Sequence, residues 1–350
     1  MKIQKTELAN KLNKVKDIVP KRTTMPVLQG VLVKDGYLIA NNLEMAVMAK
    51  LEGIENEYFI IPERAFDLIN NLPEGEIEIT VSDDYEMVIS ADKIKNKYQT
   101  LNPELFPINT VKGEKINFAV KPEVLINSIK RVSYAIPQQG QRSIMTAMCL
   151  QAKKGILNFV GLDGRLIAWD KVDYEGEFEL LIPKDTVDKL KTIGLKGDVR
   201  ITYSNSEAIF ITNEFEIYTR LVEGKYYRYS EMFKELSLHT VVSRLDLLNA
   251  ITRSKMCTEE KFPVYFEFKD NRLKISVKDN VTDYIEFVDV QENFSGELKI
   301  AFDARLIIKT LKSIDCYDIG ISFEGSKDPI IIEADDSNFK ALILPVAINN

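Results

Sequence analysis

The 350-residue chain is poor in the side chains that most enzymes use for nucleophilic or metal chemistry. His239 is its one histidine, so a Ser-His-Asp or Cys-His relay would depend on that residue, and no partner for it is evident nearby. The three cysteines, Cys149, Cys257 and Cys316, are odd in number and far apart. This spacing argues against a disulfide framework and a zinc site, and it favours a reducing, cytoplasmic compartment. We expect neither a cofactor nor a bound metal.

Several motifs are also missing. The sequence has neither common form of phosphate-binding glycine loop and no His-Glu-x-x-His segment. No apolar run approaches the length of a bilayer span, and the N-terminus has no basic segment followed by an apolar stretch, so we expect no membrane partner. Acidic pairs such as Asp83-Asp84 and Glu259-Glu260 occupy turn-like positions, where solvated turns explain them better than acid–base catalysis. An enzyme that uses carboxylates, for instance a nuclease, stays open as an alternative.

What the chain does contain is one pattern repeated three times. A strand that runs into a short helix begins at Tyr58, Leu180 and Leu298, and these starts lie about 120 residues apart. The first half of each third also corresponds, with a short strand, an amphipathic helix and strands of alternating polarity. A repeat of this length is a whole domain rather than a solenoid unit.

We therefore predict three α+β domains joined by short polar linkers near Gly113 and Leu236. The predicted domains are residues 1–113, 114–236 and 237–350. A chain of this length suits two or three domains.

The repeat predicts two helices in each domain. They are residues 6–22, 62–72, 122–136, 183–193, 243–255 and 303–314. These segments contain 17 basic and 9 acidic residues, so they carry +8 although the whole chain carries -7. Gathered on one side, they would form a basic surface on an acidic body, which can hold a phosphate backbone without reading bases. The alternative is that lysines simply occupy exposed helix faces.

Local signals indicate where the helices begin. Pro62, Pro122 and Pro183 stand where a first helical residue tolerates the missing N–H. Asp303 and Ser243 are expected N-caps, because a side-chain oxygen can accept a hydrogen bond from a free helical N–H.

Five segments carry a further signal. They are Thr24-Met-Pro-Val-Leu-Gln-Gly, Asn42-Leu-Glu-Met-Ala-Val, Leu162-Asp-Gly-Arg-Leu-Ile-Ala, Arg220-Leu-Val-Glu-Gly-Lys-Tyr-Tyr-Arg-Tyr and Leu342-Ile-Leu-Pro-Val-Ala-Ile. In order and in register with the repeat, they resemble the bacterial DNA polymerase III beta subunit family, the β sliding clamps.

The resemblance implies a non-catalytic processivity factor for DNA replication. Two three-domain chains would close head to tail into a homodimeric ring around double-stranded DNA, with helices inside and antiparallel sheets outside. The implied partners are a clamp loader, replicative and translesion DNA polymerases, and repair factors. A rival interpretation is an interaction protein on the same fold that does not close on DNA.

The family's DNA contacts map to the first helix and two loops. They are Lys11, Lys14, Arg22, Gln138, Gln139, Gln141 and Arg142. Such side chains would position a duplex without specifying its sequence, and solvation of the loops is the alternative.

The family's apolar groove for partner peptides maps to the second and third domains. Its residues are Met145, Leu162, Gly164, Arg165, Leu166, Ile167, Tyr227, Met232, Leu342, Leu344, Pro345 and Val346. A final core strand is the alternative for the tail residues. Tyr227 stands where many relatives have proline, Leu166 where arginine is expected, and Ala347 in place of a tail arginine. These departures predict altered peptide preference.

Ring closure in the family joins an edge strand of the first domain to one of the third. The matching segments here are residues 96–101 and 256–262, and ordinary strands with charged rims are the alternative. The expected interface residues are Asn96, Tyr98, Met256, Cys257, Glu259, Glu260 and Phe262. Asn96 replaces an aromatic anchor, which leaves the tightness of the dimer open.

Overall fold

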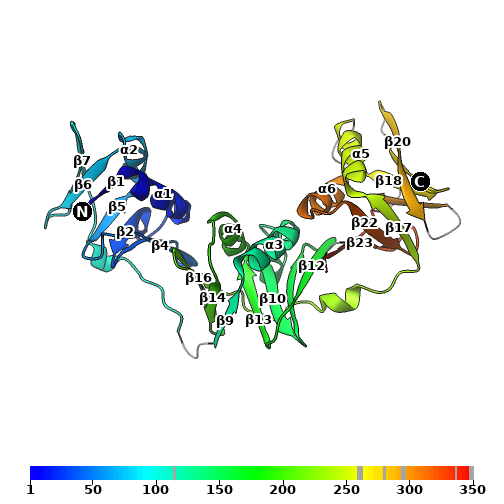
Figure 1. Cartoon of the computed structure of the whole chain (residues 1–350), viewed down its shortest axis with the longest axis horizontal. Helices are drawn as coiled ribbons and strands as arrows, with labels where there is room; N and C mark the ends of the chain where they lie inside the picture. Colours follow the sequence, from blue (N-terminus) through cyan, green and yellow to red (C-terminus); the bar gives the residue numbers. More distant parts are fainter. Residues whose placement is uncertain (113–115, 258–262, 279–280, 293–296, 336, 347–350) are drawn as a thin grey trace. The chain divides into compact units, whose positions relative to one another are not determined.

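The computed structural model describes residues 1–112, 116–257, 263–278, 281–292, 297–335 and 337–346. The chain forms two compact units. The first contains Met1–Leu125 and Lys189–Leu221, and the second contains Ile126–Asp188 and Val222–Asn350. In the described residues the α-helices are α1 (Lys5–Val15), α2 (Phe66–Asn71), α3 (Pro122–Val132), α4 (Lys184–Thr192), α5 (Arg244–Met256) and α6 (Ala304–Ser313) (Figure 1).

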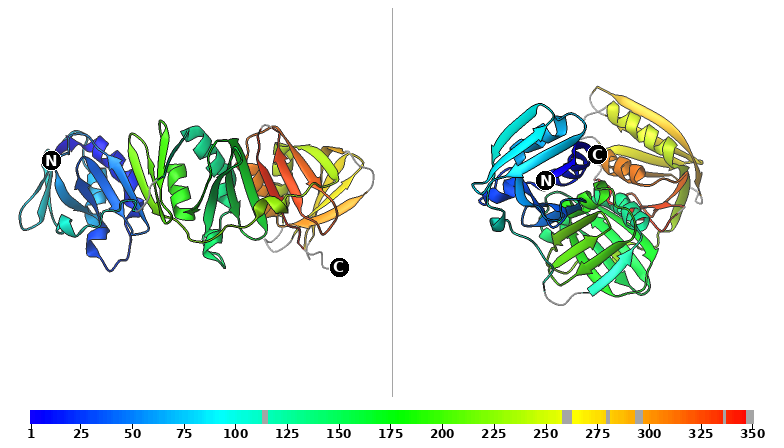
Figure 2. Two further views of the ribbon diagram at one scale, coloured as in Figure 1. Left: turned by 90° about the horizontal axis from the view of Figure 1, so that it is seen from below. Right: turned by 60° about the vertical axis from the view of Figure 1, so that its left-hand side comes forward.

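The first unit contains two antiparallel sheets. The smaller has the order β1-β6-β7-β8, with β1 at Lys2–Gln4, β6 at Glu76–Val81, β7 at Glu86–Ala91 and β8 at Ile94–Gln99. The larger has the order β5-β2-β3-β4-β16-β15-β14-β9. Its strands are β2 (Gly30–Lys34), β3 (Tyr37–Asn41), β4 (Met45–Lys50), β5 (Tyr58–Pro62), β9 (Ile116–Val120), β14 (Val199–Tyr203), β15 (Glu207–Ile211) and β16 (Phe215–Arg220). Helix α1 packs against β3 and β4 (Figure 2).

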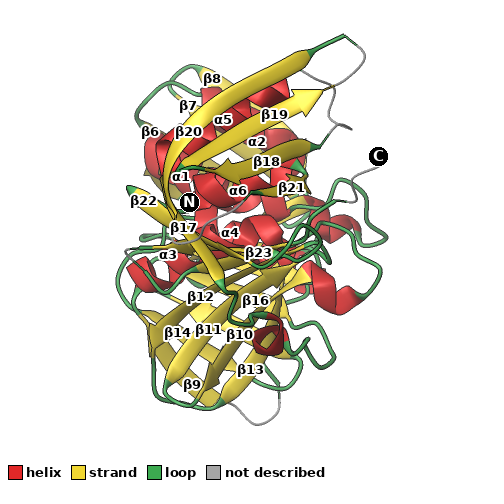
Figure 3. Cartoon of the chain, turned by 90° about the vertical axis from the view of Figure 1, so that its right-hand side faces the viewer, coloured by secondary structure: helices red, strands yellow, loops and turns green. Residues whose placement is uncertain are grey.

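The second unit contains one continuous antiparallel sheet. Its order is β13-β10-β11-β12-β24-β23-β22-β17-β20-β19-β18-β21. The strands are β10 (Ala147–Lys153), β11 (Ile156–Leu162), β12 (Leu166–Asp173), β13 (Phe178–Pro183), β17 (Leu238–Ser243), β18 (Val264–Lys269), β19 (Arg272–Lys278), β20 (Asp283–Glu292), β21 (Leu298–Phe302), β22 (Asp318–Phe323), β23 (Ile330–Ala334) and β24 (Lys340–Ile343). Helix α5 lies against β19 and β20 (Figure 3).

Alternation of polarity accounts for these strands. In β6, Ile77 and Ile79 are buried while Glu76 and Glu78 are exposed, as a sheet with one covered face requires. In helix α1, the buried residues recur at helical spacing, namely Leu8, Ala9, Leu12 and Val15. The prediction of an α+β protein with antiparallel sheets is confirmed.

Most of the expected helix boundaries agree with the structure to within one residue, but α1 ends at Val15 rather than at residue 22, α2 begins at Phe66 rather than at residue 62, and α3 ends at Val132 rather than at residue 136. Asp303 and Ser243 accept the expected capping hydrogen bonds from backbone N–H groups. The first helix is shorter than predicted: α1 ends at Val15, a single 3-10 turn follows at Lys16–Ile18, and the backbone is extended at Val19. Pro20 explains this end, because a proline disfavours the helical conformation of the residue before it.

Two of the three prolines lie one residue before the helical turn. Pro122 is the first residue of α3, as expected. Pro62 and Pro183 instead end β5 and β13, where they pair with Gly30 and Ala147. Both strands lie at the edge of their sheet, where a proline without an N–H is tolerated.

Gly161 in β11 provides a test of the packing between this strand and the C-terminal end of α3. A Cβ atom at Gly161 would lie 2.6 Å from the carbonyl oxygen of Val132 and 2.9 Å from Cγ1 of Ile136. Because the first neighbour is backbone, we expect Gly161→Ala to lower the free energy of unfolding by about 2 kcal/mol. Urea denaturation measures this loss, and an unchanged midpoint and slope would contradict the packing.

Candidate functional site

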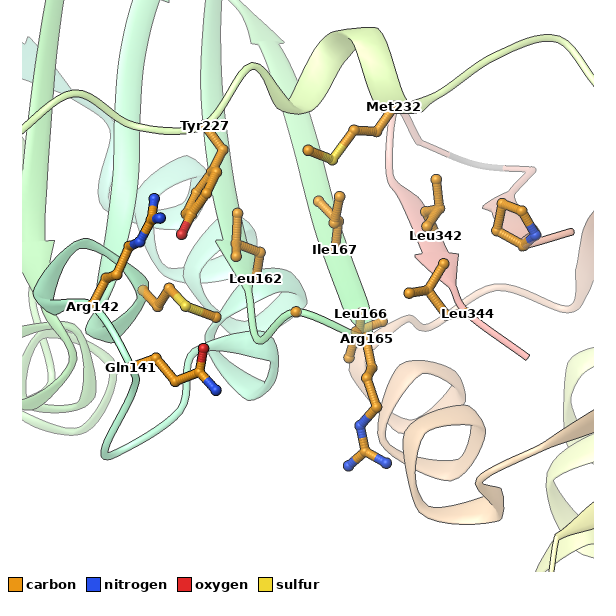
Figure 4. A pocket seen from close by; sticks show the side chains of 13 residues that line it. Gln141, Arg142, Leu162, Arg165, Leu166, Ile167, Tyr227, Met232, Leu342 and Leu344 are labelled. Atoms are coloured by element: carbon orange, nitrogen blue, oxygen red, sulfur yellow. The ribbon is translucent and has the colours of Figure 1, made fainter. Parts of the chain in front are cut away.

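The second unit contains an apolar cavity of about 490 Å³. Its walls come from segments that are far apart in the sequence (Figure 4). The lining residues are Gln141, Arg142, Met145, Leu162, Gly164, Arg165, Leu166, Ile167, Tyr227, Met232, Pro329, Leu342 and Leu344. We refer to this cavity as the groove.

One wall of the groove is the turn between β11 and β12. The carboxylate of Asp163 accepts hydrogen bonds from the backbone N–H groups of Arg165 and Leu166, both at 2.9 Å. Gly164 follows Asp163 and has a φ of 88°, a backbone conformation that glycine adopts at little cost. The Asp-Gly pair is thus a turn, and it fixes where the neighbouring apolar side chains enter the groove.

The opposite wall comes from the end of the described chain. Strand β24 pairs with β12, so that Leu342 lies opposite Ile167 and Ile343 opposite Leu166. Beyond β24, the N–H of Leu344 donates to the carbonyl oxygen of Arg165 at 2.9 Å. These backbone hydrogen bonds bring apolar side chains from two segments that are distant in the sequence to the same side of the groove.

An aromatic cluster supports the groove from below. Tyr226 and Tyr229 are buried in the same apolar cluster as Leu162 and Leu342. Trp169 meets the ring of Tyr229 edge to face, with centroids 5.2 Å apart. Burial raises the pKa of Tyr226 well above its ordinary value, so its hydroxyl stays neutral. The residues beneath the groove are therefore buried and uncharged.

Two arginines are the charged residues of the lining. Arg165 lies 3.7 Å from Oδ2 of Asp303, the N-cap of α6. That carboxylate is held more closely by Arg305, at 2.7 Å. Burial would raise the pKa of Asp303, but its hydrogen bonds to Arg305 outweigh this effect and lower it. Arg142 is exposed at the other end of the groove.

The structure brings most of the residues expected for a peptide groove together. Ten of the twelve line the cavity. Pro345 and Val346 follow it along the chain, and the N–H of Val346 donates to the carbonyl oxygen of Ala301 at 2.8 Å. Gln141 and Arg142, expected near DNA, line the groove as well. Sequence reasoning missed Pro329, which enters only because β23 lies beside β24.

The other residues expected near DNA have different environments. Arg22 and Gln139 are exposed. Lys11 donates to Glu214 at 2.8 Å and lies over the ring of Phe215. Lys14 is half-buried, and its carbonyl oxygen accepts a hydrogen bond from Lys189. Gln138 donates to Asp185 at 2.8 Å.

The segments expected at a dimer interface differ from the prediction in one respect. Asn96 and Tyr98 lie in β8, an edge strand of the four-stranded sheet. Met256 and Cys257 do not form an edge strand, because Met256 is the last residue of α5 and Cys257 is its C-cap. The helix reaches this far because its buried residues keep helical spacing up to Ser254. Glu259, Glu260 and Phe262 lie outside the described residues.

A strand with a free edge does lie next to this helix end. Strand β20 pairs with β19 over Asp283–Asp289, but with β17 only from Val290 onward. Within the described residues, the first part of β20 therefore has one ladder partner. Ile285 and Phe287 on this part are half exposed or more, at 51% and 59%.

Among the described residues, no group of three or more His, Cys, Asp or Glu could hold a metal ion. None of the helices described above is both long and apolar enough to cross a bilayer.

Three family models match the chain in order. They describe the N-terminal domain of the DNA polymerase III beta subunit at residues 1–110, its central domain at 119–227 and its C-terminal domain at 234–347. Among curated proteins, the beta sliding clamp of Staphylococcus epidermidis is 23% identical over 378 aligned residues, covering 98% of each chain. That of Staphylococcus aureus is 22% identical with the same coverage.

Solved structures with the same fold cover 99% of both chains. The sliding clamp of Pseudomonas aeruginosa bound to griselimycin is 24% identical and superposes with a TM-score of 0.93. The sliding clamp of Bacillus subtilis is 22% identical, with a TM-score of 0.92. The fold of this chain is thus that of three successive clamp domains.

Proposed function

Because this chain belongs to the DNA polymerase III beta subunit family, we propose that it is a DNA sliding clamp, a non-catalytic processivity factor that encircles duplex DNA and tethers a polymerase. The observation that carries this proposal is the ordered match of all three domains over nearly the whole chain. A closed ring keeps a polymerase at the primer end, since release of one contact no longer means escape from DNA. We propose that it works in the cytoplasm, where bacterial DNA is replicated.

We assign the groove to partner peptides. Its apolar floor, its volume of about 490 Å³ and its exposed mouth fit a few apolar anchors of a short extended segment. A clamp loader, replicative and translesion polymerases and repair factors would compete for this one site. Pro345 and Val346, which follow the lining, would border the path of the peptide.

We assign contacts with DNA to exposed cations that have no ion-pair partner among the described residues. Arg22 is one, and Lys130 on α3 and Lys309 and Lys312 on α6 are others. Lys11 is less suited, because Glu214 already neutralises its ammonium group. Gln139, which is exposed, could contact phosphate or sugar.

Substitutions at Arg22 and Lys11 should therefore differ in their effects on DNA binding. We expect Arg22→Ala to reduce the slope of log affinity against log salt by about 0.9, the value for one lost phosphate contact. Lys11→Ala should leave the slope unchanged. Fluorescence anisotropy of a labelled duplex across a salt series measures both. Equal losses in the two variants would contradict the assignment.

We propose that the ring closes between two strand edges. One is β8, which exposes Lys95 and Lys97, and the other is the first part of β20 beside the end of α5. The second edge carries Asp283 and Asp289 next to its exposed apolar residues, so the two edges are opposite in charge. Tyr98 and Met256 would add apolar contacts.

The solution mass tests ring closure. A stable mass near twice 40.0 kDa over a wide concentration range supports a dimer. We expect Tyr98→Asp to shift this mass towards the monomer, because it places a second negative edge opposite β20. Analytical ultracentrifugation of both proteins measures the shift. A native chain that stays monomeric at high concentration would favour the interaction protein that does not close on DNA.

A further inference from the structure

A turn in the first unit is built like the turn that forms one wall of the groove. Between β3 and β4, the side-chain oxygen of Asn42 accepts hydrogen bonds from the backbone N–H groups of Glu44 at 3.1 Å and Met45 at 2.8 Å. Leu43 has a φ of 77° and stands where the turn between β11 and β12 has a glycine. Since a bulky side chain rarely adopts a positive φ, the first unit keeps this backbone shape at a steric cost.

The strands beside this turn extend the likeness to the groove. Strand β16 pairs with β4 so that Tyr218 lies opposite Ala46. In the second unit, the corresponding pair is Leu342 and Ile167, which line the groove. The N–H of Arg220, the last residue of β16, donates to a carbonyl oxygen of the turn at 2.9 Å, as the residue after β24 does in the groove. The backbone that carries the groove is therefore present a second time in the chain.

In the first unit, a segment of the chain itself covers this backbone. Val111 is 6% exposed and forms an apolar cluster with Ala46 and Tyr218, and Ile209 packs against this cluster. Val111 belongs to residues 107–112, which have neither helix nor strand, and we refer to this segment as the strap. Val111 thus lies against the counterparts of two groove residues, in the place that an apolar anchor of a peptide would take.

Hydrogen bonds hold the strap on both sides of its anchor. The side-chain N–H₂ group of Asn41, which is fully buried, donates to the carbonyl oxygen of Pro107 at 2.7 Å and to the side-chain oxygen of Asn109 at 2.5 Å. Beyond the anchor, the backbone N–H of Lys112 donates to the carboxylate of Glu207 at 2.7 Å. An apolar anchor flanked by bonds to the main chain is how a short peptide docks on a protein surface.

We propose that the strap is a built-in ligand, which fills a second peptide-docking site made by Asn41, Ala46, Glu207 and Tyr218. The inference rests on the groove's assignment to partner peptides, because the parallel with the groove identifies the kind of site. A tethered segment has an effective concentration on the order of millimolar, so it excludes free peptides of moderate affinity. Each chain then presents one open peptide site, and another protein could use the second only with a segment whose apolar side chain replaces Val111.

The test uses the full-length protein and a labelled synthetic peptide with the sequence of residues 106–112, Phe-Pro-Ile-Asn-Thr-Val-Lys, with an amidated C-terminus. Every variant carries Leu344→Asp, so that the groove does not contribute to binding. Val111→Asp is added to release the strap, because a carboxylate does not stay in an apolar cluster. Ile108→Asp is the matched control, since it adds the same charge to the strap at a side chain that is 43% exposed.

Fluorescence polarisation at protein concentrations up to the millimolar range measures the affinity, and thermal melts verify that the variants fold. We expect the Val111→Asp protein to bind the peptide at least about 10-fold more tightly than the Ile108→Asp protein or Leu344→Asp alone, because the tethered competitor has left the site. A peptide with aspartate in place of its valine should bind none of the proteins. If Val111→Asp unfolds the chain, the double change Val111→Ala, Asn109→Ala weakens the strap without a charge and decides in the same way.

The inference is overturned if the folded release variant binds no more peptide than Leu344→Asp alone. It is also overturned if Ile108→Asp raises the affinity equally, or if the aspartate peptide binds as well as the native sequence. None of these results affects the assignment of the groove, because Leu344→Asp is compared with the native strap in a separate experiment on that site. Encirclement of DNA is likewise decided on its own, by retention on circular templates.

Discussion

Replacing Leu344 with aspartate is expected to weaken the binding of a partner peptide by about 30–100-fold, because a charge would then lie on the apolar wall that receives the anchors. Leu344 is 40% exposed, so the folded chain can tolerate the new carboxylate. Its backbone N–H keeps the bond to Arg165 in the variant. Isothermal titration with a peptide from the replicative polymerase measures the loss.

Leu245→Asp is the matched control. Leu245 lies in the first turn of α5, is 49% exposed and does not line the groove. The two variants therefore add the same charge to leucines of similar exposure. Equal affinity of both for the peptide, with both chains folded, would contradict the assignment of the groove.

Replacing Arg131 with methionine is expected to lower the free energy of unfolding by about 3 kcal/mol near neutral pH. Arg131 on α3 lies 3.4 Å from Asp170 on β12, whose side chain is 1% exposed. Burial raises the pKa of Asp170 although Ser128 and Arg131 oppose the shift. Removing the arginine leaves a buried carboxylate without its counter-charge, which is the costly case.

The loss should depend on pH in a defined direction. Because the folded pKa of Asp170 lies above its ordinary value of 3.8, the native state binds more protons than the unfolded chain between these two values. The stability contributed by Asp170 is therefore present at low pH and is lost as pH rises through the folded pKa. The effect of Arg131→Met should shrink between about pH 7 and pH 4.

Urea denaturation of three proteins across this pH range provides the measurement. The double variant Arg131→Met, Asp170→Asn should recover part of the stability at neutral pH, because no buried charge is left. A loss for Arg131→Met that is independent of pH, and that the second substitution does not relieve, would show that the ion pair does not act as described.

Local signals predicted much of the secondary structure. The N-caps Asp303 and Ser243 depend on neighbouring residues alone, so the sequence was sufficient to place them. The helix predicted over residues 243–255 ends within one residue of α5, but the resemblance matched Met256 and Cys257 to an edge strand, whereas they are the last residue and the C-cap of this helix.

The groove illustrates what only the fold reveals. Leu162 and Leu342 lie 180 positions apart in the sequence, and the pairing of β12 with β24 brings their segments together. The resemblance supplied most of these residues, since no local pattern links them. It assigned Arg142 to a loop near DNA, and the structure shows in addition that Arg142 lines the groove. The ion pair between Lys11 and Glu214 could not be predicted from the sequence either, because the two residues are far apart along the chain.

Encirclement of DNA is the central claim, and retention on circular and linear DNA tests it most directly. The chain would be loaded onto a nicked circular plasmid by its clamp loader, freed of unbound protein by gel filtration, and then followed after the plasmid is cut once with a restriction enzyme. We predict that the chain stays on the circle in high salt and leaves within minutes of linearisation, because it can slide off the ends. Equal retention on both forms, or dissociation from the circle at high salt, would contradict a closed ring.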